Sequence, residues 1–307
     1  MIKLTLVLAA LAAFNRTILA EEIFAVGWPA QAYSIESTTG AARGLGTVSA
    51  IAVNALARSP AGVLYTINST DLLRVDPVTG AATKVVSINP GVSFLNVPAM
   101  AFSPAGVLYF INRDAGDFPN DWLFSLDVNT GQGHPIGLTF LNAHMQGLAC
   151  APNGTLYGWH TEVGLVTINP GTGNATDVNP GLGATANLQC LGFSPGGTLY
   201  GAQMALYIVN PSDGALSLVG GTLADIRGLE FIPKQTPKLT VSSTANGVRV
   251  CALTQNNRTY QLQYRSGLES TNSWANLGAA MPGTGAEICV TNTVNAGRQF
   301  YRLAVTP

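Results

Sequence analysis

The sequence predicts an all-β fold: a five-bladed β-propeller whose N- and C-terminal ends close the ring, followed by a small β-sandwich domain. Three observations support this prediction. One turn-and-strand element recurs along the chain, only 10% of the 307 residues are charged, and the chain holds 34 Gly and 17 Pro. Many tight turns between short, uncharged strands produce such a composition, whereas a helical bundle does not.

The repeat has two anchors in each unit. The first is an x-Pro-x-Gly-x-Leu-Tyr element, with Leu-Tyr at 64–65, 108–109, 156–157 and 199–200. The second reads "LLRVDPVTG" (72–80), "LFSLDVNTG" (123–131), "LVTINPGTG" (165–173) and "LYIVNPSDG" (206–214), and these four segments align without a gap. This spacing suits one four-stranded propeller blade per unit.

Each unit predicts four strands, which we call a to d in chain order. Strand a ends at the Pro-x-Gly turn, strand b carries Leu-Tyr, strand c ends at the second anchor, and strand d follows it. Gly provides the backbone freedom that the a–b turn needs, and the Asp or Asn that ends strand c can hydrogen-bond its own backbone two residues on. Strand b is apolar on both faces, as expected of a strand between neighbouring blades.

Two leftover fragments make a fifth unit. Residues 23–47 supply strands b, c and d, and residues 226–233 supply strand a. Pairing of these two ends would close the ring and remove exposed edges. We therefore expect residues 21–234 to form the propeller. A propeller with another blade number is the main alternative, and an open solenoid is less favoured because the end fragments are complementary.

The N-terminus predicts export. Lys3 precedes an apolar run of 11 residues, and Ala20 is a small residue suited to cleavage, so residues 1–20 are expected to be a signal peptide. A retained signal-anchor is the alternative. No second apolar stretch of membrane length follows, so we expect no membrane span in the mature chain and a secreted or extracytoplasmic location, at the cell surface or in the periplasm. The net charge of −1 does not indicate the excess of basic residues that nucleic-acid binding requires.

After a Pro/Lys-rich linker (235–240), residues 241–307 contain short alternating strands without the earlier anchors. They predict a reduced immunoglobulin-like sandwich, with Trp274 as a core anchor. Cys251 and Cys289 both fall in this region and could form a disulfide. Cys150 and Cys190 lie in apolar surroundings, where buried free thiols are at least as favoured as a bridge.

Two resemblances follow from these residues. The "GLAFSPxGTLYG…LYxINPxTGxxxxVG" rhythm resembles secreted bacterial propellers of the broad class with NHL and YVTN-type repeats. The tail that begins "YQLQYRSGLESTNSW" and ends "RQFYRLAV" looks like a fibronectin type III-like module. Both resemblances imply architecture and an extracellular location, and neither carries a catalytic motif.

The two ends of the predicted ring differ. The a–b and c–d turns are nearly identical between units, whereas the b–c and d–a loops vary, and variable loops on a rigid scaffold commonly bind ligands. Aligned strands a place a polar ring at the channel mouth on the variable side, where amides and Arg can orient hydroxyls and carboxylates. A water-filled polar channel is the alternative. The ring contains Asn54, Asn96, His144, Gln146, Asn187, Gln189, Asp225 and Arg227.

The longest b–c loop, "NRDAGDFPNDW" (112–122), adds two hypotheses. Its Asp114, Asp117, Asn120 and Asp121 could bind Ca²⁺, although a solvated loop whose acids cap turns is the favoured interpretation, and no other cofactor is expected. His144 lies close to it in the predicted order, as do Trp159, His160 and Glu162, and these four could form an acid, imidazole and aromatic patch for a sugar or a peptide.

The favoured function is an exported, non-catalytic binding or interaction protein that presents a glycan or protein site on the variable-loop face. No catalytic residue is assigned, because the chain lacks a G-x-S-x-G motif, an H-E-x-x-H motif and a phosphate-binding loop. One alternative is an extracellular carbohydrate-active hydrolase or lyase at the channel mouth, which the single carboxylate of the ring, Asp225, disfavours. A structural cell-surface protein is the other.

Overall fold

The computed structural model describes residues 21–306, except 50, 93–94, 114–120, 142–143, 234–238, 245–246, 255–258, 268–272, 285 and 294–298. Every regular element in these residues is a β-strand. In this part of the chain no helix has the length and apolarity needed to cross a bilayer. The prediction of an all-β chain is therefore confirmed, and the signal-peptide prediction for residues 1–20 lies outside the described residues.

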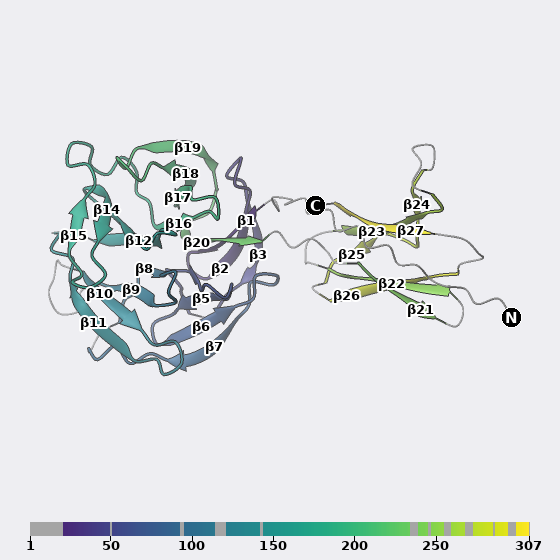
Figure 1. The fold of residues 1–307 in the computed structure, drawn as a ribbon, viewed down its shortest axis with the longest axis horizontal. Helices are drawn as coiled ribbons and strands as arrows, with labels where there is room; N and C mark the ends of the chain where they lie inside the picture. The colour runs from purple at the N-terminus through teal and green to yellow at the C-terminus, as the bar shows by residue number, and fades with distance from the viewer. Residues whose placement is uncertain are drawn as a thin grey trace.

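Residues 57–221 form four antiparallel four-stranded sheets, each built from consecutive strands in the predicted order a to d (Figure 1). The first contains β4 (Ala57–Arg58), β5 (Leu64–Ile67), β6 (Asp71–Val75) and β7 (Ala82–Ser87). The second contains β8 (Ala99–Phe102), β9 (Leu108–Asn112), β10 (Trp122–Leu126) and β11 (Gly133–Leu138). The third contains β12 (Met145–Cys150), β13 (Leu156–His160), β14 (Gly164–Ile168) and β15 (Ala175–Asp177). The fourth contains β16 (Cys190–Phe193), β17 (Leu199–Ala202), β18 (Ala205–Val209) and β19 (Leu216–Gly221).

A fifth sheet joins the two ends of the repeat. It has the order β20 (Ile226–Pro233), β1 (Glu21–Gly27), β2 (Gln31–Ile35) and β3 (Ala42–Thr47). β20 runs antiparallel to β1, with Phe24 opposite Glu230 and Val26 opposite Gly228. In Figure 1 the green β20 accordingly lies beside the purple β1.

The turns have the predicted chemistry. Gly62, in the first a–b turn, has a φ of 85°, in the left-handed region that a side chain makes unfavourable. Asp76 ends strand c of the same unit, and its Oδ1 accepts a hydrogen bond from the Val78 amide two residues on, at 2.7 Å. These local features explain why the same short motifs recur in the four consecutive units.

The five a strands contact one another in the order β4, β8, β12, β16, β20 and again β4. Figure 1 shows the labelled members of this set near the centre and strands such as β7, β11, β15 and β19 at the periphery. Apolar side chains fill the space between neighbouring sheets. On β9, Leu108 and Phe110 join one buried cluster, whereas Tyr109 and Ile111 pack in another. Both faces of strand b are therefore packed against neighbours, as its sequence predicted, and this burial is the main favourable contribution to folding.

Residues 239–306 form two further sheets around Val250, Leu262 and Leu277. One contains β21 (Leu239–Thr244), β22 (Gly247–Leu253) and β26 (Glu287–Asn292). The other contains β23 (Thr259–Arg265), β24 (Ala275–Asn276), β25 (Met281–Pro282) and β27 (Phe300–Thr306). The expectation that Trp274 anchors this core is wrong. Its half-buried ring lies against two guanidinium groups, with Arg265 Cζ at 4.4 Å and Arg302 Cζ at 4.5 Å from the ring centroid.

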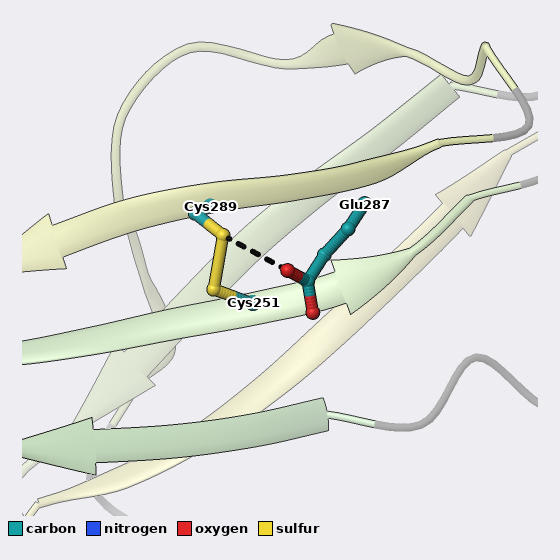
Figure 2. Close-up of side chains that lie close together, drawn as sticks. All are labelled: Cys251, Glu287 and Cys289. Carbon is teal, nitrogen blue, oxygen red and sulfur yellow. Dashed lines mark hydrogen bonds between the residues drawn. A yellow bond between two sulfur atoms is a disulfide. The ribbon is translucent and has the colours of Figure 1, made fainter.

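Cys251 and Cys289 form a disulfide between directly opposed residues of β22 and β26. Figure 2 shows it beside Glu287, whose carboxylate oxygen lies 3.7 Å from Cys289 Sγ. Because the disulfide occupies both sulfurs, this trio is not available as a metal site. Cys150 and Cys190 are free thiols, one half-buried and one buried.

Candidate functional site

Five of the eight residues predicted for the polar ring line one small cavity at the end of strands a where the b–c and d–a loops lie, whereas His144, Asn187 and Asp225 are not in its lining. We call this cavity the mouth. It has a volume of about 30 Å³. Most of the lining was expected from the alignment of strands a, and Arg113 is an addition from the long b–c loop. The lining residues are Asn54, Asn96, Pro98, Arg113, Gln146, Gln189 and Arg227.

Arg227 organises one side of the mouth. Its guanidinium forms a two-point pair with Asp225, with Nε–Oδ1 at 2.9 Å and Nη2–Oδ2 at 2.6 Å. Nη1 donates to Gln189 Oε1 at 2.9 Å, and Gln189 Nε2 donates in turn to Asn187 Oδ1 at 2.8 Å. Such a two-point pair fixes the orientation of both groups. Asp225 is therefore committed to holding Arg227 and is not a free carboxylate at the mouth.

Asn54 presents an unsatisfied acceptor to the same cavity. Its Oδ1 is buried and has no hydrogen-bond partner among the described residues. A buried polar atom without a partner is costly and uncommon in folded proteins.

Asp121, one of the predicted calcium ligands, has another role. Its fully buried side chain accepts a hydrogen bond from the Met145 amide at 2.7 Å, and its Oδ1 lies 3.3 Å from His144 Nδ1. Burial raises the pKa of Asp121, and the Met145 hydrogen bond opposes this effect, as do the charges of Arg113 and His144. Asp121 thus ties the long b–c loop to the start of β12.

The remaining predicted calcium ligands, Asp114, Asp117 and Asn120, lie outside the described residues. The calcium hypothesis stays a prediction. A melting temperature that chelator leaves unchanged would argue against it, because a ligand that binds the folded state raises that temperature.

The predicted aromatic and imidazole patch does not assemble on the surface. Trp159 is 1% exposed, and its Nε1 donates to the Ala186 carbonyl at 3.1 Å. His160 is also 1% exposed, and its Nδ1 accepts from the amides of Glu162 and Val163 at 3.2 Å each. Trp159 and His160 are the last two residues of β13 and are buried, whereas Glu162 is exposed and the His144 side chain, beside Asp121, is 29% exposed.

Several b–c and d–a loops carry exposed apolar side chains, a feature that the sequence analysis missed. Phe140 is 64% exposed and Leu223 is 91% exposed, and each has a positive φ, 57° and 55° respectively. Backbone strain of this kind persists only where the surrounding structure holds it, often at functional sites. In the sequence, the exposed Phe140 and Leu223 could have been recognised from the Thr-Phe and Thr-Leu pairs that follow strand d. The exposed apolar residues of these loops include Trp28, Ile51, Phe140, Leu182, Met204 and Leu223.

Comparisons with known proteins identify the repeat but not its activity. A family model described as a repeat of unknown function, DUF6923, matches residues 25–247. No curated protein matches the chain.

Among solved structures, the chain is similar to a protein of unknown function from Bacteroides thetaiotaomicron, with 14% identity, a TM-score of 0.47 and coverage of 76% of this chain and 66% of that chain. A gluconolactonase from Xanthomonas campestris shows 14% identity and a TM-score of 0.44, covering 73% and 75%. A putative TolB from Agrobacterium tumefaciens shows 14% identity and a TM-score of 0.40, covering 94% and 99%. Likeness at this level carries no argument about function.

Proposed function

The chain belongs to the DUF6923 repeat family, whose function is unknown, and from this premise we propose that it is an exported, non-catalytic binding protein. Its ligand, a glycan or a protein, binds on the face formed by the b–c and d–a loops. The observation that carries the proposal is the convergence of amide and guanidinium side chains from successive repeat units on the mouth.

The proposed scaffold is a five-bladed propeller over residues 21–234, closed where β20 meets β1. The antiparallel pairing of these strands and the cyclic contacts of the a strands support it. Residues 1–20 serve as the export signal. Residues 241–307 form a fibronectin type III-like module that spaces or attaches the propeller, and their two sheets and disulfide are in keeping with an extracellular module.

The geometry sets how a ligand would be held. A mouth of about 30 Å³ is far smaller than the roughly 300–1,000 Å³ of sites that enclose small molecules. The ligand therefore lies across the face and inserts one polar group, which the amides and Arg227 bind. Trp28 lies beside Arg227, with its ring centroid 5.7 Å from the guanidinium carbon, and offers a flat apolar surface to a sugar ring or an apolar side chain.

A glycan array followed by affinity measurements on the whole protein tests this proposal. Replacing Gln146 with Ala removes a mouth amide, and we expect roughly 5- to 100-fold weaker binding, because a hydrogen bond of this kind contributes about 1–3 kcal/mol when its partner is left unpaired. Arg74→Ala, at an exposed position on β6, is the control and should bind as the wild type does. Equal affinities of the Gln146→Ala variant and the wild type would refute a ligand site at the mouth.

One observation favours a second function. The buried Asp121 beside His144 is an acid–imidazole pair of the kind that performs acid–base catalysis. A carbohydrate-active hydrolase or lyase at the mouth is therefore the second candidate. A broad hydrolase screen separates the two, since binding without turnover supports the binding protein, whereas turnover that is lost in His144→Ala supports the enzyme. Surface assembly with neither binding nor turnover would instead support a structural protein.

A further inference from the structure

The larger opening lies at the opposite end of the a strands, where the a–b turns are. We call it the turn-end cavity. Its volume of about 360 Å³ falls within the range of sites for small ligands. The Ser-Pro and Ala-Pro pairs of the turns form its outer wall, and the last residues of the strands form its inner wall. These inner residues are Arg58, Phe102, Cys150, Phe193, Glu230 and Phe231.

The repeat provides an internal reference for this cavity. At one aligned position near the end of strand a, three units carry a Phe whose ring packs on the strand-b Tyr of the preceding unit. The ring centroids are 5.6 Å apart for Tyr65–Phe102, 5.7 Å for Tyr157–Phe193 and 5.1 Å for Tyr200–Phe231. The remaining units carry Cys150 and Arg58 at this position. Cys150 and Arg58 therefore interrupt a set of aligned positions that otherwise all carry Phe.

The position before it is also exceptional in one unit. Ala57, Ala101, Ala149 and Gly192 occupy it in four units, whereas the fifth carries Glu230. At Gly192 an added Cβ would lie 2.5 Å from Leu229 Cδ1, so the space there is tight. An acidic side chain at such a position is not required by the repeat.

The two exceptions meet where β20 faces β4. Glu230 Oε1 accepts a hydrogen bond from the Arg58 amide at 3.0 Å. The Arg58 guanidinium itself forms no ion pair within 4.0 Å among the described residues. Its buried Nε also has no hydrogen-bond partner in this part of the chain. Arg58 is half-buried and lines the cavity, so a carboxylate bound there would pair with its guanidinium.

The other ionisable groups of the lining do not supply this anion at neutral pH. Burial raises the pKa of Glu230 to about 8, although the hydrogen bond and charge of Arg58 oppose the shift. Burial also raises the pKa of the Cys150 thiol. The turn-end cavity therefore combines one positive charge with walls of Phe and Pro.

We propose that the turn-end cavity is a second binding site, which takes a small carboxylate with an aromatic or branched apolar body. Arg58 binds the carboxylate, and Phe102, Phe193 and the turn prolines contact the apolar body. This site is independent of the mouth, since it lies at the other end of the strands and shares no lining residue with it.

Calorimetric titration of the full-length protein with phenylacetate at pH 7, and with phenylacetamide as the uncharged probe, tests the proposal. Wild-type protein should bind phenylacetate more tightly than the amide. Arg58→Gln should weaken phenylacetate binding on the order of 10- to 100-fold, because it removes a charge-assisted hydrogen bond, and should change amide binding little. Arg74→Gln, at an exposed position in the same repeat unit, is the matched control and should change neither.

Cys150→Phe gives a second test that does not touch the charge. It restores the residue that other units carry at this position opposite a Tyr, so the variant is expected to fold, and the added ring reduces the cavity. Both probes should then bind at least tenfold more weakly. The proposal is overturned if wild-type protein binds neither probe, if Arg58→Gln retains wild-type affinity for phenylacetate, or if Cys150→Phe leaves both affinities unchanged.

Discussion

Replacing Leu229 with alanine tests whether the ends of the repeat form one structural unit. Leu229 lies on β20, is 0% exposed and packs in a cluster that includes Ile23 and Ala25 of β1 and Leu206 of the fourth sheet. Truncation of a buried Leu to Ala costs about 2–5 kcal/mol, through lost apolar contact and the cavity left behind. That is a large share of the roughly 5–15 kcal/mol by which a domain is stable.

Amide hydrogen exchange is the informative measurement. If β20 holds β1 in place, the amides of Glu21–Gly27 should exchange faster in the variant although the substitution lies near the other end of the repeat. A loss of about 2–5 kcal/mol corresponds to roughly 30- to 3,000-fold faster exchange through local opening. Leu148→Ala, at the equivalent position of β12, is the matched control and should leave β1 less affected. Equal exchange of β1 in the two variants would refute the proposed closure.

Three further predictions concern single groups. Glu230 has a pKa of about 8 in the folded protein, against an ordinary value of 4.5 for a glutamate. Between these values the folded protein holds a proton that is lost on unfolding, so the contribution of Glu230 to stability falls as pH rises through this window. Glu230→Gln removes this dependence, and its melting temperature should rise relative to wild type from pH 5 to pH 8 and then stay parallel; identical pH profiles would contradict the assignment. Replacing Cys251 and Cys289 with Ser should destabilise residues 239–306 by about 2–4 kcal/mol in denaturant titrations, since the disulfide closes a 38-residue separation. Exchange in residues 21–233 should stay unchanged, and faster exchange there would show that the two parts are coupled. Asp121→Ala should cost about 1–3 kcal/mol because it leaves the Met145 amide unpaired, whereas Asp121→Asn should recover most of that loss; equal melting temperatures of the two variants would count against this role.

The local elements were predictable because each depends on neighbouring residues. The Pro-x-Gly turn, the Asp76-type turn and the two apolar faces of strand b all follow from short-range chemistry, and the repeat displays each of them several times. The alignment of strands a also placed Asn54, Gln146, Gln189 and Arg227 together, because equivalent positions of a repeat lie at the same height.

The errors arose where the surroundings of a side chain depend on how whole sheets and strands pack. Trp159 and His160 were expected in a loop on the surface, but they end a strand that neighbouring sheets cover. Trp274 was expected in a core, but two Arg side chains from the neighbouring strands β23 and β27 hold it near the surface. Polarity and size describe a residue alone and do not say which neighbour reaches it.

By itself the sequence determined the strands, the turns and the polar ring of this protein, since periodicity and turn chemistry act over a few residues. Only the tertiary structure decided that the larger cavity lies at the end where the turns look alike, because it brings Arg58 and Glu230, 172 residues apart in the chain, to the same strand interface. Burial raises the pKa of Glu230, and Arg58 has a buried Nε without a hydrogen-bond partner among the described residues. Each of these properties depends on the packing of whole sheets.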